Sequence, residues 1–247
     1  MDVAKTESAV RLTGSVSSVH NLAGACLLLG GTGLGALALS APVGAAATIL
    51  PLLSCALLCG VLYQAPPFRW SYKGRGEPLC FISFGPLATC AFYLAAAAAS
   101  PLTGGQTALS LASVSPAACV ASLLVGCTTT AILFCSHFHQ EKTDKAAGKQ
   151  SPIVRLGTAK AAQALRLGVL ATYALSTSAS LAGWLPLPVA CGALLAAPVA
   201  RTLLTFVGTN HGDPGVVFKA KFFATRWHAS TGLLLTLAFA AARLLAR

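Results

Sequence analysis

Long apolar segments alternate with short polar ones along the whole chain. A membrane-spanning helix needs about 20 apolar residues, and the pattern predicts seven of them, at residues 20–41, 44–64, 80–100, 109–135, 161–184, 186–207 and 229–246. The segments are continuous and rich in Ala and Leu, whereas a membrane β-barrel shows alternating segments of about 10 residues. The predicted fold class is therefore an all-α, polytopic transmembrane helix bundle, with residues 1–247 forming a single membrane-embedded domain.

The composition excludes a soluble protein. Only 9% of the 247 residues are charged and 55% are hydrophobic, whereas soluble domains carry about 25% charged residues. A net charge of +11 would suggest a nucleic-acid partner for a soluble protein. In a membrane bundle, basic loops that face an anionic bilayer surface or an anionic substrate explain that charge, so no nucleic-acid partner is predicted.

The charged residues are concentrated in four polar segments. All six acids and fourteen of the seventeen Lys and Arg residues lie at residues 2–11, 69–77, 141–166 and 213–226. The other three connections, around residues 41–44, 100–106 and 184–188, carry no charge. Because alternate connections of an up-down bundle share a side, all four segments are expected on one face of the membrane. By the positive-inside rule this face is the cytoplasm, or the stroma in a plastid.

Topology alone requires only Lys and Arg, but these segments also contain acids, histidines, amides and glycines. Polar loops that converge over a membrane bundle predict a binding site at the boundary between water and lipid. Such a site suits an amphiphilic substrate.

Two of the segments carry long motifs. Residues 63–78 read Y-Q-A-P-P-F-R-W-S-Y-K-G-R-G-E-P, and residues 137–157 read H-F-H-Q-E-K-T-D-K-A-A-G-K-Q-S-P-I-V-R-L-G. Together they resemble the UbiA superfamily of intramembrane prenyltransferases, and more closely its MenA-type branch of cyanobacteria and plastids, which phytylates a naphthoate in phylloquinone synthesis. The resemblance continues in the last polar segment, at Asn210, His211, Lys221, Phe222 and Arg226, and covers essentially the whole chain.

The resemblance implies magnesium-dependent transfer of a phytyl group from phytyl diphosphate to 1,4-dihydroxy-2-naphthoate in a plastid membrane, with loss of the acceptor's carboxylate. A prenyl diphosphate ionises when its leaving diphosphate is stabilised, and an electron-rich aromatic ring then attacks the allylic cation. Mg²⁺ that bridges carboxylates and diphosphate, with Lys and Arg on the remaining oxygens, supplies that stabilisation.

Asp144 matches the last acid of the superfamily's second Asp-rich motif and is the predicted magnesium ligand and catalytic residue. Glu141 and Gln140 are further candidate ligands, although Gln140 stands where the family usually has an acid and offers only an amide oxygen. Arg69 and Lys73 are the other predicted catalytic residues. The predicted diphosphate-binding residues are Arg69, Lys73, Arg75, Lys145, Lys149 and Arg155. For any one of these bases, topology alone is an equally good explanation.

A third set is expected at the acceptor or the mouth of the loops, and comprises Tyr63, His137, His139 and Asn210. The pattern His137-x-His139 could also indicate a transition-metal site. Without a third soft ligand nearby, hydrogen bonding is the preferred interpretation.

The amino-terminal region departs from the family pattern. The superfamily's first Asp-rich motif is absent, and residues 2–12 resemble the stretch that follows it, with Asp2 on its final acid and thus a candidate metal ligand. The family has about nine helices, against seven predicted here. We therefore expect the sequence to be incomplete at its N-terminus; a genuinely shortened protein would lack half of the metal site.

Other functions remain open at this stage. The nearest alternative keeps the chemistry and changes the substrates, as in a homogentisate or menaquinone-type polyprenyltransferase. A transporter predicts charged or broken helices at the midplane and matching halves, and neither is evident in the sequence. A noncatalytic membrane protein is the third possibility, and the missing first motif is its best support.

Overall fold

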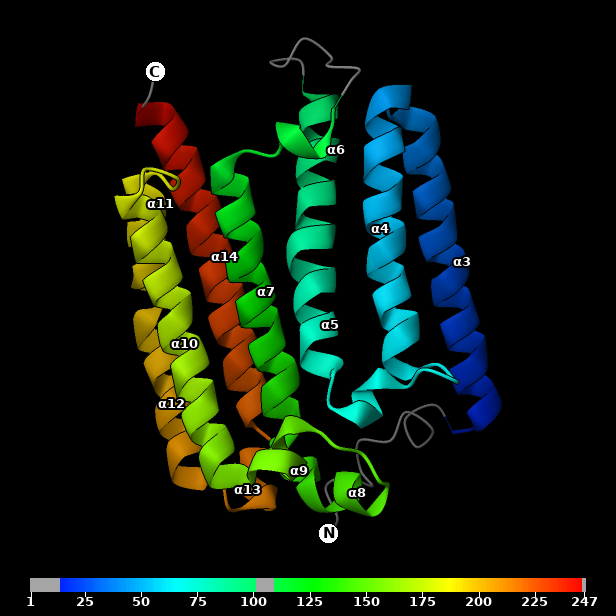
Figure 1. The fold of residues 1–247 in the computed structure, drawn as a ribbon, viewed down its shortest axis with the longest axis vertical. Coiled ribbons are helices and arrows are strands. Elements are labelled where there is room, and N and C mark those ends of the chain that lie inside the picture. The colour runs from blue at the N-terminus through cyan, green and yellow to red at the C-terminus, as the bar shows by residue number, and fades with distance from the viewer. Residues whose placement is uncertain (1–13, 101–108, 246–247) are drawn as a thin grey trace.

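A computed structural model describes residues 14–100 and 109–245, and all the regular structure in them is helical (Figure 1). This confirms the predicted fold class. The long helices are α3 (Val16–Ser40), α4 (Val43–Gln64), α5 (Gly76–Ile82), α6 (Cys90–Ala99), α7 (Pro116–Ser136), α10 (Thr158–Leu181), α11 (Leu187–Leu195), α12 (Ala197–Asn210) and α14 (Ala220–Leu245). The shorter elements are η1 (Trp70–Lys73), η2 (Ser83–Thr89), η4 (Leu111–Ser113), η5 (Phe138–Gln140), α8 (Glu141–Ala146), α9 (Pro152–Leu156) and α13 (Pro214–Val217).

Within the described residues, six helical segments are long and apolar enough to cross a membrane. They are Val16–Ser40, Val43–Gln64, Gly76–Ala99, Pro116–Ala146, Leu187–Asn210 and Pro214–Leu245. The seventh predicted span is present as α10, whose 24 residues lie alongside α7. It is not among the six, because Lys160, Arg166 and several Ser and Thr residues lower its hydropathy. All seven predicted segments are therefore helical in the structure, and six of them are apolar enough to be counted as candidate spans.

Two of the spans are interrupted, although each was predicted as one continuous segment. Between α5 and α6 the chain forms a π-helical turn, η2, around Pro86, and the α11–α12 span is broken at Ala196, just before Pro198. Proline removes a backbone donor and clashes with the preceding turn, so these are the positions where a helix is expected to bend. Pro116, by contrast, lies in the first turn of α7, which begins seven residues later than predicted and is capped by the Ser115 hydroxyl.

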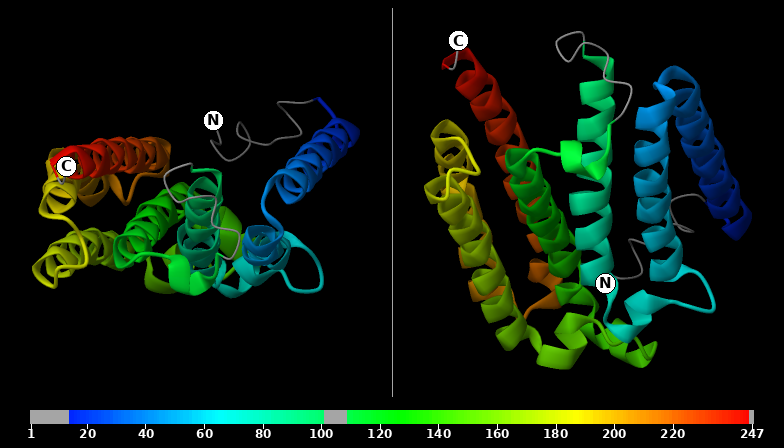
Figure 2. Two further views of the ribbon diagram at one scale, coloured as in Figure 1. Left: turned by 90° about the horizontal axis from the view of Figure 1, so that it is seen from above. Right: turned by 45° about the horizontal axis from the view of Figure 1, so that its top comes forward.

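Helix α7 lies at the centre of the bundle. It packs on α5 and η2 on one side and on α10 and α14 on the other. Viewed from above, α7, α10, α12 and α14 form two layers, and α5/α6, α4 and α3 extend from them as a single curved row (Figure 2). Trp227 of α14 is the largest fully buried side chain in the core of the two-layered part, and its Nε1 donates to the Tyr173 hydroxyl at 3.0 Å.

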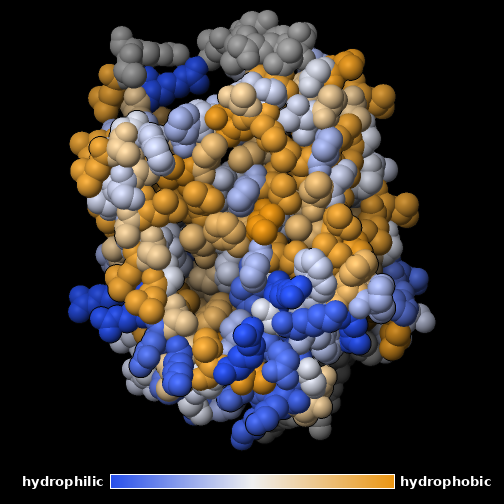
Figure 3. Space-filling view, viewed as in Figure 1, coloured by the Kyte–Doolittle hydropathy of each residue, from blue (hydrophilic) through white to orange (hydrophobic). Residues whose placement is uncertain are grey.

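The polar connections lie together at one end of the bundle. The short elements η1, α8, α9 and α13 occupy the lower end in Figure 1, and the hydrophilic surface gathers at that end in Figure 3, below a broad apolar belt. This arrangement confirms the shared face for residues 69–77, 141–166 and 213–226. The first charged segment, residues 2–11, lies outside the described residues.

The shared face makes a prediction for sealed vesicles. Lys73, Lys149 and Lys219 all lie on the polar end, so a membrane-impermeant amine reagent should label all three from one side only. Trp184 is 60% exposed in the opposite connection, so the variant Trp184→Lys should gain a label from the other side. Labelling of Lys73 and Lys219 from opposite sides would contradict the topology.

Candidate functional site

The predicted metal ligand, Asp144, is a buried carboxylate at the polar end of the bundle. It lies in α8 and is 8% exposed. The Lys149 ammonium donates to its Oδ1 at 3.3 Å and lies 3.1 Å from its Oδ2, and the Lys149 amide donates to the Asp144 carbonyl at 2.8 Å. The predicted carboxylate and one predicted diphosphate-binding base are therefore directly paired.

One oxygen of this carboxylate has spare bonding capacity. Oδ2 of Asp144 is buried and accepts no hydrogen bond from the described residues, although the Lys149 charge lies within ion-pair distance. The contact is therefore electrostatic and poorly aligned. A buried, partly satisfied carboxylate oxygen is costly unless a further ligand completes it, so Asp144 is poised to accept a cation or a proton donor.

The loop before α5 is joined to the loop after α8 through its backbone. The Gln150 amide donates to the Tyr72 carbonyl at 2.8 Å. Gly74, at a φ of 69°, lies so close that an added Cβ would come within 2.5 Å of the Gln150 carbonyl oxygen and 3.1 Å of an Arg155 guanidinium nitrogen. Arg155 of α9 is thereby placed against the loop that carries Lys73 and Arg75, as the motifs predicted.

The two arginines of residues 69–75 are held against aromatic rings. The Arg69 guanidinium lies 4.0 Å from the centre of the Tyr72 ring, and that of Arg75 lies 5.6 Å from the Trp70 ring. Arg69 also has a φ of 43°, the left-handed region that a non-glycine residue rarely adopts. Such strain is concentrated at functional sites, where the surrounding structure maintains it. Arg69, Lys73 and Arg75 are all exposed at the polar end of the bundle.

Glu77 was not among the predicted site residues, yet it is the single acid of residues 69–77 and it is buried. It begins α5, is 9% exposed, and its Oε1 lies 3.0 Å from Nδ1 of His137, which is 3% exposed at the end of α7. The pair joins two elements 60 residues apart. The G-E-P sequence was the available signal, but its partner could be identified only in three dimensions.

Tyr63 lies against the start of the same helix. An added Cβ at Gly76 would come within 2.8 Å of the Tyr63 ring, so the glycine allows the end of α4 to approach α5 closely. Tyr63 is thus placed beside the start of α5, next to Glu77.

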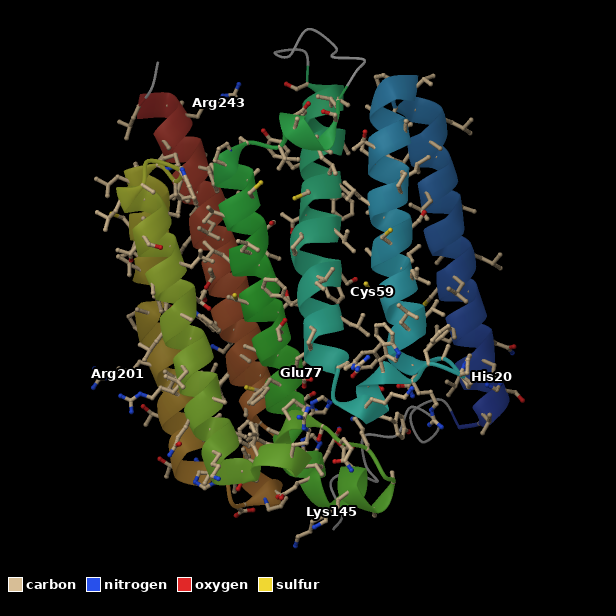
Figure 4. The ribbon with its side chains drawn as sticks, in the orientation of Figure 1. His20, Cys59, Glu77, Lys145, Arg201 and Arg243 are labelled. Carbon is tan, nitrogen blue, oxygen red and sulfur yellow. The ribbon has the colours of Figure 1, made fainter. Side chains whose placement is uncertain are left out.

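The remaining predicted residues are more widely distributed. His139 of η5 is buried, and the centre of its ring lies 6.5 Å from the ring centre of Phe218 in an edge-on arrangement. Because Phe218 directly follows α13, this contact packs η5 against that segment. The Asn210 side-chain amide donates to the Phe206 carbonyl of its own helix at 2.8 Å. Lys145 is exposed and points away from the bundle (Figure 4).

The candidate metal ligands around Asp144 differ in their placement. Glu141 begins α8 and is half-buried. The Gln140 carbonyl accepts from the Thr143 hydroxyl at 3.0 Å, a contact within the same turn. Asp2 lies outside the described residues. Among the residues that the structure describes, no three His, Cys, Asp or Glu side chains form a metal-binding group.

An apolar cavity of about 200 Å³ lies one helical turn deeper than the Glu77–His137 pair. Its lining includes Phe81 of α5, Phe134 of α7 and Trp227 of α14. Phe81 is four residues beyond Glu77, and Phe134 is three residues before His137, so both lie about one turn, roughly 5 Å, further into the membrane. The site therefore combines a charged mouth with an apolar interior.

This geometry defines a class of protein: a polytopic membrane protein with a charged mouth at the water boundary and an apolar cavity between its helices. The sequence model of the UbiA prenyltransferase family matches residues 2–227. The chain belongs to that family.

Two relatives cover nearly the whole chain. The 2-carboxy-1,4-naphthoquinone phytyltransferase, chloroplastic, of Arabidopsis thaliana is 43% identical over 242 residues, which are 98% of this chain and 61% of the relative. The 2-carboxy-1,4-naphthoquinone phytyltransferase of Synechocystis sp. is 38% identical over 238 residues, 95% of this chain and 71% of the relative. The chain thus spans about three fifths and seven tenths of their lengths. No solved structure matches it.

Proposed function

We propose that this protein transfers a phytyl group from phytyl diphosphate to a naphthalene carboxylate in phylloquinone synthesis, in a plastid membrane. The observation that carries the proposal is the buried Asp144 carboxylate, with one oxygen available, among bases at the mouth of an apolar cavity. The names of the two relatives favour the phytyl donor and the naphthalene acceptor, and the Arabidopsis name favours the plastid.

The diphosphate of the donor binds the cationic loops. Lys149 and Arg155 come from one loop, and Lys73 and Arg75 from the loop attached to it through Gly74. Charge-assisted hydrogen bonds from these side chains hold the non-bridging oxygens, and they strengthen as negative charge accumulates on the leaving group. Because arginine presents a planar fork of donors, Arg155 is suited to grip two diphosphate oxygens at once.

Asp144 is the described residue best suited to a divalent cation. Mg²⁺ is commonly held by one or two carboxylates together with substrate phosphates, and the Oδ2 atom of Asp144 has the free acceptor capacity that this requires. When bound, Mg²⁺ supplies charge neutralisation for the departing diphosphate. Lys149, whose ammonium lies 3.1 Å from the same oxygen, adds a second positive charge beside the departing diphosphate.

The hydrocarbon part of the donor enters the apolar cavity below the loops. There, Phe81, Phe134 and Trp227 exclude water from the allylic carbon, which protects a cation from hydrolysis. The carbon–oxygen bond of the donor breaks with its electron pair on diphosphate, and a carbon–carbon bond forms to the acceptor ring. The acceptor's carboxylate leaves as CO2 and its bonding pair stays on the ring, so charge and electrons balance.

The redox form of the acceptor is a specific part of the proposal. The resemblance predicts 1,4-dihydroxy-2-naphthoate, whereas the names of the relatives give 2-carboxy-1,4-naphthoquinone, its oxidised form. Electrophilic attack requires an electron-rich ring, so the dihydroxy form is expected to be the faster acceptor. Replacing the carboxylate with a phytyl group is redox-neutral for both acceptors: the dihydroxy form gives a dihydroxy product and the quinone gives a quinone.

Membranes that contain the protein test this assignment directly. With phytyl diphosphate as donor, we expect dihydroxynaphthoate to be prenylated and homogentisate to be left unchanged. Product formation is followed by mass spectrometry, with the same membranes lacking the protein as control. Faster consumption of homogentisate would overturn the branch assignment, and absence of any prenylated product with all donor and acceptor pairs would overturn the function.

A further inference from the structure

A second polar hollow lies on the outer side of the bundle, between α10 and α12. Its volume is about 520 Å³, and its lining includes two arginines, one from each helix, together with polar and small residues. The lining residues used below are Gln163 and Arg166 of α10 and Arg201, Thr205 and Gly208 of α12. We call this hollow the α10–α12 groove.

The α10–α12 groove faces away from the candidate active site. The faces of the two helices that pack into the core carry Leu165 and Leu203, both buried. Arg166 and Arg201 are exposed on other faces of the same helices. Figure 4 shows Arg201 at the outer edge of the bundle, pointing away from it. The surroundings of the groove in a membrane are therefore lipid, and not the interior of the bundle.

The two arginines lie at matching depths. Arg166 is eight residues beyond the start of α10 and Arg201 is nine residues before the end of α12, which places them about 12 and 14 Å from the polar ends of their helices. Those ends are joined by a contact of 3.1 Å between Nδ1 of His211 and the Thr158 hydroxyl. Two cations on antiparallel neighbours thus lie at one level, in the half of the bundle that ends at the polar face.

These cations have no carboxylate partner among the described residues. The buried acids are engaged elsewhere, since Glu77 contacts His137 and Asp144 contacts Lys149. Positively charged side chains within membrane helices are costly unless a counter-charge or water accompanies them. The positive-inside rule explains bases in the loops, but it gives no reason for two arginines on adjacent helix faces that share one groove.

We propose that the α10–α12 groove binds the headgroup of an anionic membrane lipid. The anionic group lies between Arg166 and Arg201, Gln163 and Thr205 offer hydrogen bonds, and an acyl chain continues along the exposed apolar residues Leu167 and Leu170 of α10. Basic pockets between membrane helices near the positive face are suited to anionic headgroups. A bound lipid would also link α10 to the rest of the bundle on the side where α10 is least apolar.

The test uses the whole chain in lipid nanodiscs made of phosphatidylcholine with a minor fraction of phosphatidylglycerol. Lipids that remain bound after mild detergent release are counted by native mass spectrometry. The wild-type protein should retain phosphatidylglycerol in preference to phosphatidylcholine. The double variant Arg166→Gln/Arg201→Gln should retain it at least about tenfold more weakly, because two charge-assisted contacts are lost.

Three further variants separate binding from folding. Arg166→Lys/Arg201→Lys keeps both charges and should retain most of the preference. Gly208→Leu keeps both arginines but fills the groove, and an added Cβ at Gly208 has no atom within 4 Å, so this variant should fold and lose the lipid. Arg243 lies in the last turn of α14, at the end of the bundle away from the polar loops. The variant Arg243→Gln should therefore behave as wild type.

Three results would overturn the proposal. One is equal retention of phosphatidylglycerol by the wild type and by the double glutamine variant. Another is retention of phosphatidylglycerol and phosphatidylcholine by the wild type without preference. The last is displacement of the lipid by inorganic phosphate at millimolar concentration, since the groove would then be a weak site for any phosphate and not for a lipid headgroup.

Discussion

The variant Asp144→Asn is expected to lose prenyl transfer almost completely. The substitution keeps the size of the side chain and removes its negative charge. That charge attracts Lys149, which lies 3.1 Å away, and it makes Oδ2 a ligand for a cation. Loss of one preorganised contact to the developing charge of the leaving group costs about 3 kcal/mol or more, roughly a 150-fold fall in turnover. The measurement is kcat with phytyl diphosphate in membranes where the wild-type protein is active.

The matched control is Asp213→Asn. Asp213 accepts a hydrogen bond from the Gly215 amide at the start of α13, in an exposed turn of the same polar face. It undergoes the same chemical change without touching the site, and its turnover should stay within about twofold of wild type. Near-normal kcat for Asp144→Asn would remove this carboxylate from the mechanism. An equal loss in both variants would indicate a general effect of surface charge.

A second large effect is expected from one added methyl group, in Gly74→Ala. The new Cβ would lie 2.5 Å from the backbone carbonyl oxygen of Gln150, and a backbone atom cannot rotate away as the end of a side chain can. The two loops must therefore separate, which moves Arg155 relative to Lys73 and Arg75. A displacement of about 1 Å in a positioned group is sufficient for a loss on the order of 100-fold in kcat/KM.

Gly148→Ala provides the control for backbone strain. Gly148 has a φ of 71°, nearly the value of Gly74, but an added Cβ there meets no atom within 4 Å. Both variants thus carry the cost of an alanine in the left-handed region, roughly 1 kcal/mol in stability, and only Gly74→Ala forces the loops apart. If the two variants lose activity equally, the contact between the loops is not what positions the bases.

Much of the fold follows from periodicity and charge alone. The distribution of Lys, Arg and acids indicated correctly that residues 69–77, 141–166 and 213–226 share one end of the bundle. The interruptions around Pro86 and Pro198 could not be located in the same way, because packed membrane helices accommodate some prolines without breaking. Pro51 illustrates this, since it lies inside the continuous helix α4.

The candidate site was predictable in its residue types and not in its pairings. The motif identified Asp144 and the bases around it, but hydrogen-bond partners far apart in sequence are set by how the helices pack. Glu77 therefore looked like one polar residue among several, although it is bound to His137 from another helix. The left-handed backbone of Arg69 was equally inaccessible, because arginine has no intrinsic preference for that conformation.

The placement of the charged mouth on one face and the apolar cavity one turn deeper has a thermodynamic consequence for the proposed reaction. Its two main products belong to different phases. Inorganic diphosphate returns to the aqueous compartment that borders the polar loops. The ring loses its carboxylate and gains a hydrocarbon chain whose hold on the bilayer is about 0.8 kcal/mol for each buried methylene. Reversal would require the two products to meet again at the membrane surface, so their separation disfavours the back reaction.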